Sequence, residues 1–230
     1  MRKDMASLAQ NGILRVAINT GNGALVQQED GVLSGISPAL ATRLADQIGA
    51  RMQPVVYGGA GKVFADADQD AWDVAFLAID AMRAEKIAYT RAYVTIEATY
   101  AVRADSRFQS ISDIDSPGVR VLTALGSAYD MHLTQTLQNA TLERSGTPSE
   151  SFAEFRDGRC NAVAGVRASL MSFFADDPHI RLLPGVLTKV EQAMVLPDRR
   201  DPRIVALDAF VSEAMEDGFV ARVLAQTTRK

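Results

Sequence analysis

Short apolar runs rich in Val, Ile and Ala alternate along the chain with segments in which apolar residues recur at helical spacing. Buried strands read as near-continuous apolar runs, and their alternation with helices is typical of βαβ units with a largely parallel sheet. The pattern therefore predicts an α/β fold. Strands are expected at residues 14–18, 53–57, 73–77, 96–103, 119–123, 161–165 and 192–196.

The helical segments carry recognisable start and stop residues. Ser37-Pro38 predicts a helix start, with Ser37 as the N-cap and Pro38 at the first helical position. Apolar residues recur every four positions from Leu40, and Gly49 is expected to end this helix. Asp80 should cap a helical turn. A hairpin-like turn is expected at 29–31, and further helices from 61, up to 138, at 150–156, from 202 and after 218.

The pattern restarts after a polar stretch at 110–117, and both halves run strand, glycine-bearing turn, helix, helix, strand. We therefore expect two lobes, each with its own sheet, joined by two crossing strands instead of one continuous sheet. Open α/β sheets bind ligands beyond the carboxyl ends of their strands. The residues that bind a ligand should therefore follow Ile18, Leu77, Thr123 and Gly165.

Composition narrows the class of partner. The 230 residues are 47% hydrophobic and 23% charged, with a formal net charge of −4 and a pI near 5.3. Because there is no Lys/Arg cluster, a nucleic-acid partner is not expected. No apolar stretch is long enough to span a bilayer. A single cysteine and two histidines argue against a disulfide or a structural zinc site, and no cofactor is expected.

The segment from Asp73 to Arg103 contains the phrases Asp80-Ala81-Met82-Arg83 and IAYTRAY (residues 87–93). It resembles the core motif of the bacterial extracellular solute-binding proteins, family 3, the polar amino acid class with the type II periplasmic-binding-protein fold. Residues 31–44, Gly126-Ser127 and residues 215–224 resemble further motifs of that family, in the same order. The resemblance thus extends over nearly the whole chain.

The resemblance implies a two-lobed α/β fold, with a mixed, mainly parallel sheet flanked by helices in each lobe. Lobe 1 would comprise residues 1–95 plus 193–230 and lobe 2 residues 96–192, with the hinge near 94–96 and 191–193. Such a protein is the solute-binding component of an ABC-type uptake system. It closes over its ligand as a monomer and delivers it to a membrane permease. A periplasmic or extracellular location is implied, with a leader absent from this sequence.

In the family, an arginine at the position of Arg83 clamps the ligand's α-carboxylate, and a guanidinium fork suits two carboxylate oxygens. Gly126-Ser127 lies at a strand-to-helix turn where a hydroxyl and main-chain N–H groups favour an anion. Ser127 can equally be a plain helix N-cap, and the two roles are compatible.

Departures from the family pattern change the expected ligand. Gly165-Val166-Arg167 stands where the family places the aspartate that receives the ligand's ammonium group. Asn19 to Gly23 supplies no aromatic ring. We therefore expect a small carboxylate that lacks an α-amino group. Arg167 is either a second anion contact or a solvated helix start. The expected ligand contacts are Asn19, Asn22, Ala60, Ala78, Arg83, Gly126, Ser127 and Arg167.

Other functions were weighed against binding. Gly21-x-Gly23 and the glycine-rich run at 58–62 each lack required residues of a dinucleotide or phosphate loop. A dehydratase similar to cyclohexadienyl dehydratase would need a general acid in the cleft, but Glu97 lies near the hinge and the strand end of lobe 2 offers Val166 and Arg167. A sensory ligand-binding domain would bind its ligand in the same way as a transport protein. The sequence therefore favours a binding protein over an enzyme.

Overall fold

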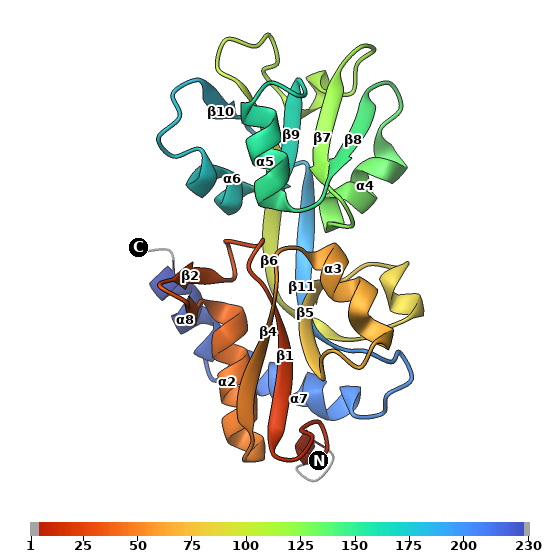
Figure 1. Ribbon diagram of the computed structural model, residues 1–230, viewed down its shortest axis with the longest axis vertical. Coiled ribbons are helices and arrows are strands. Elements are labelled where there is room, and N and C mark those ends of the chain that lie inside the picture. The colour runs from red at the N-terminus through yellow and green to blue at the C-terminus, as the bar shows by residue number, and fades with distance from the viewer. Residues whose placement is uncertain (1–4, 228–230) are drawn as a thin grey trace.

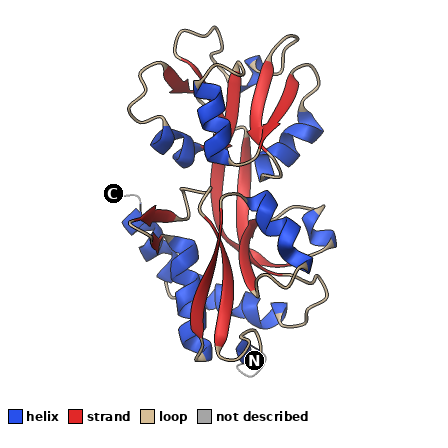
Figure 2. Ribbon diagram, in the orientation of Figure 1, coloured by secondary structure: helices blue, strands red, loops and turns tan. Residues whose placement is uncertain are grey.

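The computed structural model describes residues 5–227. Figure 1 shows two lobes, one above the other, with β6 (Ala88–Arg103) and β11 (Thr188–Leu196) running from one to the other. Helices lie on both sides of the strands in each lobe (Figure 2). The fold is therefore the expected two-lobed α/β arrangement. None of the helices within residues 5–227 has the length and apolar character needed to cross a bilayer.

Lobe 1, at the bottom of Figure 1, holds the N-terminal elements and the last two helices. Its elements are β1 (Ile13–Asn19), β2 (Gln27–Glu29), β3 (Val32–Ser34), α2 (Ile36–Ile48), β4 (Arg51–Tyr57), α3 (Ala60–Ala65), η1 (Asp66–Asp68), β5 (Val74–Ala78), η2 (Arg83–Glu85), α7 (Ile204–Glu216) and α8 (Phe219–Thr227). Lobe 2 contains η3 (Ile111–Asp113), β7 (Arg120–Ala124), α4 (Ala128–Thr136), β8 (Thr141–Ser145), α5 (Pro148–Arg156), β9 (Ala162–Val166), α6 (Arg167–Phe173) and β10 (Ile180–Leu182).

Within residues 5–227, nine strands form one hydrogen-bonded sheet in the order β4-β1-β5-β11-β6-β9-β7-β8, with β10 paired to β6, and β2 and β3 form a separate hairpin. The expectation of a separate sheet in each lobe was therefore wrong. The path is continuous because β6 pairs with β11 from Ala88 to Ala98 and then with β9 from Ala98 to Val102. The sheet is mixed: β1 and β7 have parallel neighbours, whereas the crossing strands pair antiparallel.

Each lobe has its own apolar core. In lobe 1, the apolar face of α2 and the α7 residues Leu207 and Phe210 pack on the sheet around Val16 and Val74. In lobe 2, Phe155 of α5 packs with the neighbouring strands in one cluster, and residues of α4 pack on the other face in a second cluster. Fully burying a large apolar side chain contributes about 1.5–3 kcal/mol. Each lobe is therefore stabilised by its own apolar core.

Most predicted elements lie at the expected positions, but the start of α2 does not. The helix begins after Gly35, and Ser37 is inside it, with a buried hydroxyl 3.3 Å from the Tyr93 hydroxyl. Gly35 has φ 103°, and a Cβ there would lie 2.4 Å from the Leu25 carbonyl oxygen. A close main-chain contact therefore determines this helix start. Gly49 ends the helix with φ 70°, as predicted.

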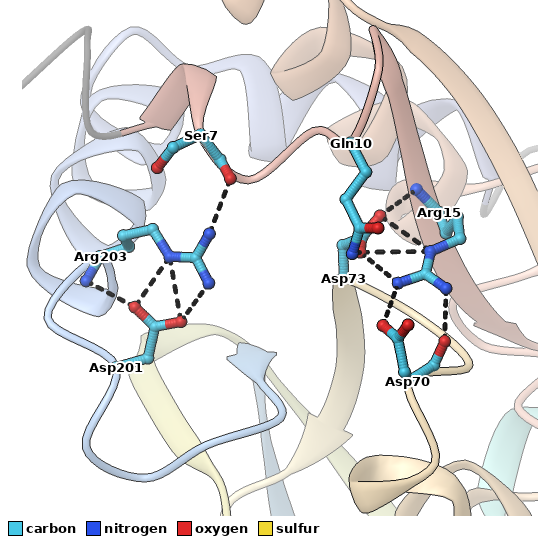
Figure 3. Close-up of polar contacts among 7 residues, drawn as sticks. All are labelled: Ser7, Gln10, Arg15, Asp70, Asp73, Asp201 and Arg203. Carbon is cyan, nitrogen blue, oxygen red and sulfur yellow. Dashed lines mark hydrogen bonds and ion pairs between the residues drawn. The ribbon is translucent and has the colours of Figure 1, made fainter.

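Two arginine–carboxylate groups lie near the N-terminal segment of lobe 1 (Figure 3). Arg15 of β1 bonds Asp73, just before β5, at 2.7 Å. Arg203, just before α7, pairs with Asp201 at 2.5 Å and donates to the Ser7 carbonyl at 2.7 Å. The start of the chain is thus tied to segments about 60 and 200 residues away.

Candidate ligand-binding site

A cavity lies between the lobes, at the carboxyl ends of the strands. The last residues of β1, β5, β7 and β9, which are Asn19, Ala78, Ala124 and Val166, all line it. This placement agrees with the rule for open α/β sheets. The cavity has a volume of about 40 Å³. In this conformation the lobes are therefore closed over a small chamber.

The structure brings five predicted contacts into the cavity wall: Asn19, Asn22, Ala60, Ala78 and Ser127. They come from both lobes. Arg83 and Gly126 lie beside the wall, because the Arg83 guanidinium donates to the Gly126 carbonyl across the cleft and to the Ala78 carbonyl at 3.5 Å. Seven of the eight predicted contacts are thus in or next to one chamber.

Arg83 is a buried charge with 2% of its surface exposed. Asp80 accepts a hydrogen bond from the Arg83 main-chain N–H at 3.0 Å, which confirms the predicted cap of this turn. The guanidinium lies 5.8 Å from the centre of the Phe64 ring, and burial lowers the pKa of Arg83. Within residues 5–227 no carboxylate forms an ion pair with it. Arg83 is therefore a buried cation beside the chamber without a direct ion-pair partner among the described residues, with Tyr89 and Asp80 nearby favouring its charged form.

Ser127 is the N-cap of α4, as predicted, and its hydroxyl oxygen accepts from the Asp130 N–H at 3.1 Å. The Asp130 carboxylate in turn accepts from the Gly126 N–H and pairs with Arg144, each at 2.8 Å. Because Arg144 forms an ion pair with Asp130, the carboxylate that holds this turn does not place an unpaired negative charge there. The cap uses only a lone pair of the Ser127 hydroxyl, so its proton remains able to donate.

The sequence analysis missed the rings that line the chamber. No aromatic residue follows β1, but Tyr129 of α4, Phe152 of α5 and Phe76 of β5 contribute rings. The Tyr129 hydroxyl is buried without a hydrogen bond to any described residue. Two of these three rings therefore come from lobe 2. Helical periodicity places Tyr129 on α4 but does not indicate that it faces lobe 1.

Two polar residues of the chamber were also missed. Gln192 of β11 is 5% exposed and faces the cavity from the crossing strand. It is the polar first residue of the otherwise apolar run QAMVL (192–196), and this was the only indication available in the sequence. Ser169 of α6 lines the opposite side and accepts from the Gly23 N–H across the cleft at 3.0 Å. No lining residue, all of them within the described part of the chain, is charged.

The lobes meet at a main-chain contact between Gly61 of α3 and the turn Leu125-Gly126. A Cβ placed at Gly61 would lie 2.7 Å from the Leu125 carbonyl oxygen. A Cβ at Gly126 would lie 2.9 Å from the Gly61 Cα. Real Cβ atoms do not approach other atoms so closely. The closed form therefore depends on the absence of side chains at these two positions.

Arg167 is the predicted contact that the structure does not bring to the chamber. Its Nε lies 3.4 Å from Glu97 Oε2, and its Nη2 donates to the Gly185 carbonyl. Val166, its neighbour at the end of β9, lines the cavity instead. Of the two readings of Arg167, the position at a helix start agrees with the structure, although the side chain is bonded within lobe 2.

Comparison with known proteins agrees with this geometry. No curated protein matches the sequence. Among solved structures, ArgBP from T. maritima (a P235GK mutant) is 18% identical with a TM-score of 0.85, covering 99% of this chain and 100% of that one. The cysteine-binding protein of Campylobacter jejuni is 20% identical with a TM-score of 0.84, covering 97% and 92%. An ancestral amino acid-binding protein, described as a precursor of cyclohexadienyl dehydratase, is 18% identical with a TM-score of 0.81, covering 96% and 98%.

At these identities the likeness shows the fold, and the family follows from the sequence. The model of the bacterial extracellular solute-binding proteins, family 3, matches residues 14–227, which is nearly the whole chain. The chain therefore belongs to family 3 of the bacterial extracellular solute-binding proteins.

Proposed function

We propose that this protein is the solute-binding component of an ABC-type uptake system and that its ligand is a small carboxylate without an α-amino group. The observation that carries the proposal is Arg83, a buried cation without a carboxylate partner in the described chain, beside a chamber lined by no charged residue. A ligand carboxylate would balance this charge. It would take the place of the Gly126 carbonyl as acceptor of the guanidinium hydrogen bonds.

The chamber is unfavourable for an ammonium group. An α-amino acid brings a positive charge that needs a carboxylate or several acceptors inside the closed site, because an unpaired buried charge costs several kcal/mol. Val166 occupies the end of β9, where the family pattern has its aspartate, and it is 8% exposed. Structural relatives are named for binding arginine and cysteine. Because the chamber is unfavourable for an ammonium group, we do not extend the amino-acid ligands of these relatives to this chain.

We further propose that lobe 1 comprises residues 1–95 plus 193–230, that lobe 2 comprises 96–192, and that closure bends the chain near 94–96 and 191–193. Two features support this hinge. Only β6 and β11 run between the lobes in Figure 1, and the pairing of these strands is irregular between Gln192 and Ala193. The partners would be a membrane permease and the solute alone, with the protein acting as a monomer in the periplasm or outside the cell.

The dehydratase alternative finds less support in the chamber. That reaction needs a general acid within hydrogen-bond reach of the leaving hydroxyl. Glu97 does not line the cavity and pairs with Arg167 at 3.4 Å. The chamber itself, within the described residues, holds no acidic side chain. Binding without chemistry is therefore the function that we propose.

The proposal is tested by Arg83→Ala and Arg83→Lys. Losing one partner of a buried charge pair costs about 2–5 kcal/mol, so calorimetric titration with the best carboxylate of a screening panel should show about 30-fold weaker binding for Arg83→Ala. Arg83→Lys should recover part of the affinity. Arg200→Ala, at an arginine whose side chain is 85% exposed, serves as the control. Unchanged affinity in Arg83→Ala, or a preference for α-amino acids over their deamino counterparts, would contradict the proposal.

A further inference from the structure

Two side-chain amides in the chamber form no hydrogen bond within residues 5–227. Asn22 is 9% exposed and Gln192 is 5% exposed, and neither amide bonds to any residue that the structure describes. Of these two amides, only the Asn22 Oδ1 is a buried atom without a hydrogen-bond partner among the described residues. Buried polar groups are nearly always hydrogen-bonded in folded proteins, and an unmatched one needs an explanation. A ligand that fills the chamber would provide one.

The positions of these amides connect them to the proposed carboxylate site. Gln192 of β11 lies opposite Ala78 in the ladder with β5, and the Ala78 carbonyl is a hydrogen-bond acceptor of Arg83. Asn22 and Gln192 both line the main chamber and also a small pocket next to it. From lobe 2, Tyr129 and Ser127 line the same chamber. A bound carboxylate at Arg83 would therefore have neutral polar groups within its immediate surroundings.

The chemistry of these groups selects the second group of the ligand. An amide offers both a donor and an acceptor, so it is satisfied by a group that can donate and accept. A hydroxyl does both and carries no charge. A second carboxylate only accepts and would leave Asn22 Oδ1 unmatched, whereas an ammonium cannot accept. A methyl group would leave both amides without partners.

The volume of the chamber limits the size of the ligand. The cavity is about 40 Å³ in volume, so the ligand should be small. We propose that the site takes small hydroxycarboxylates, with Asn22 and Gln192 as the residues that determine this specificity. This inference rests on the proposed function, because it assumes a carboxylate at Arg83.

Calorimetric titration with matched pairs of compounds tests the inference. Glycolate is compared with acetate, and lactate with propionate and alanine. One buried hydrogen-bonding group left unmatched should weaken binding about tenfold or more. Lactate should therefore bind at least about tenfold more tightly than propionate. Asn22→Leu and Gln192→Leu should reduce this ratio towards one, while Gln28→Leu, at an exposed position of β2, should keep it.

Thermal unfolding of each variant checks folding, and Asn22→Ala, which adds no bulk, replaces Asn22→Leu if the latter does not fold. Equal affinities for lactate and propionate, both dependent on Arg83, would overturn this inference and leave the proposed function intact. A preference for alanine over lactate, or no binding by any carboxylate, would overturn both the inference and the proposed function.

Discussion

Replacing Gly61 with alanine should hold the two lobes apart and weaken ligand binding without unfolding either lobe. Gly61 lies in the first turn of α3, and its Cα faces the turn Leu125-Gly126 of lobe 2. The new Cβ would lie 2.7 Å from the Leu125 carbonyl oxygen, whereas ordinary contact begins at 3.4 Å. The main chain of the two lobes would have to separate by about 0.7 Å at this point, the difference between these distances.

The size of the effect follows from the state that contains the clash. Inserting a methyl group into a close-packed contact costs about 1–3 kcal/mol, and here only the closed state contains the contact. The dissociation constant should therefore rise about 5- to 150-fold. The substitution should stabilise the open state, because alanine is more favourable than glycine in a helix by about 1 kcal/mol. The melting temperature of the unliganded protein should therefore not fall.

Calorimetric titration with the best carboxylate of the panel measures the affinity, and small-angle scattering of the saturated protein measures closure. Gly58→Ala is the matched control on the same edge of the cleft. A Cβ at Gly58 would meet only the Thr147 methyl group, at 3.3 Å, and a side chain can turn aside. The control should change affinity less than about threefold. Equal affinities and equal radii of gyration for Gly61→Ala and wild type would refute this reasoning.

Two further predictions concern stability. Tyr93→Phe removes the buried hydrogen bond to Ser37 and should lower the free energy of unfolding by about 1 kcal/mol in urea denaturation, while no change would show that this bond is neutral. The hydrogen bonds from Arg203 lower the pKa of Asp201 from its ordinary 3.8, so Asp201 stabilises the fold above about pH 4 and this contribution is lost as the pH falls. The stability difference between wild type and Asp201→Asn should therefore shrink from about pH 6 to about pH 3, and a constant difference would contradict the assignment.

The sequence pattern predicted the helices and strands whose positions are determined by neighbouring residues in the chain. β5 reads as an uninterrupted apolar run and is buried along its whole length, and Gly49 ends α2 because the chain needs a left-handed residue there. β8, with the sequence TLERS, was missed because its exposed edge position leaves little apolar pattern. The short β10 was missed as well, and α6 was indicated only as a helix start at Arg167, one of two interpretations of that residue.

The parts of the site that were missed depend on long-range pairing. Gln192 faces the chamber because of the register between β11 and β5, which joins residues more than 100 positions apart. Arg167 lies away from the chamber because Glu97, 70 residues earlier, is its partner. Neither the strand register nor the Glu97–Arg167 contact can be recognised from the pattern of neighbouring residues in the sequence. Arg83 could be identified because the motif that carries it is contiguous in the chain.

The sheet order also determines when the chain can fold during synthesis. β5 lies between β1 and β11, yet 109 residues separate its last residue, Ala78, from Thr188, the first residue of β11. Until β11 leaves the ribosome, the apolar run VAFLA has one unpaired edge, and such an edge favours aggregation. Lobe 2 can form from a continuous segment earlier. A nascent chain that stalls before residue 188 would thus need a chaperone to shield β5, and refolding should be slow because this pairing spans so much of the chain.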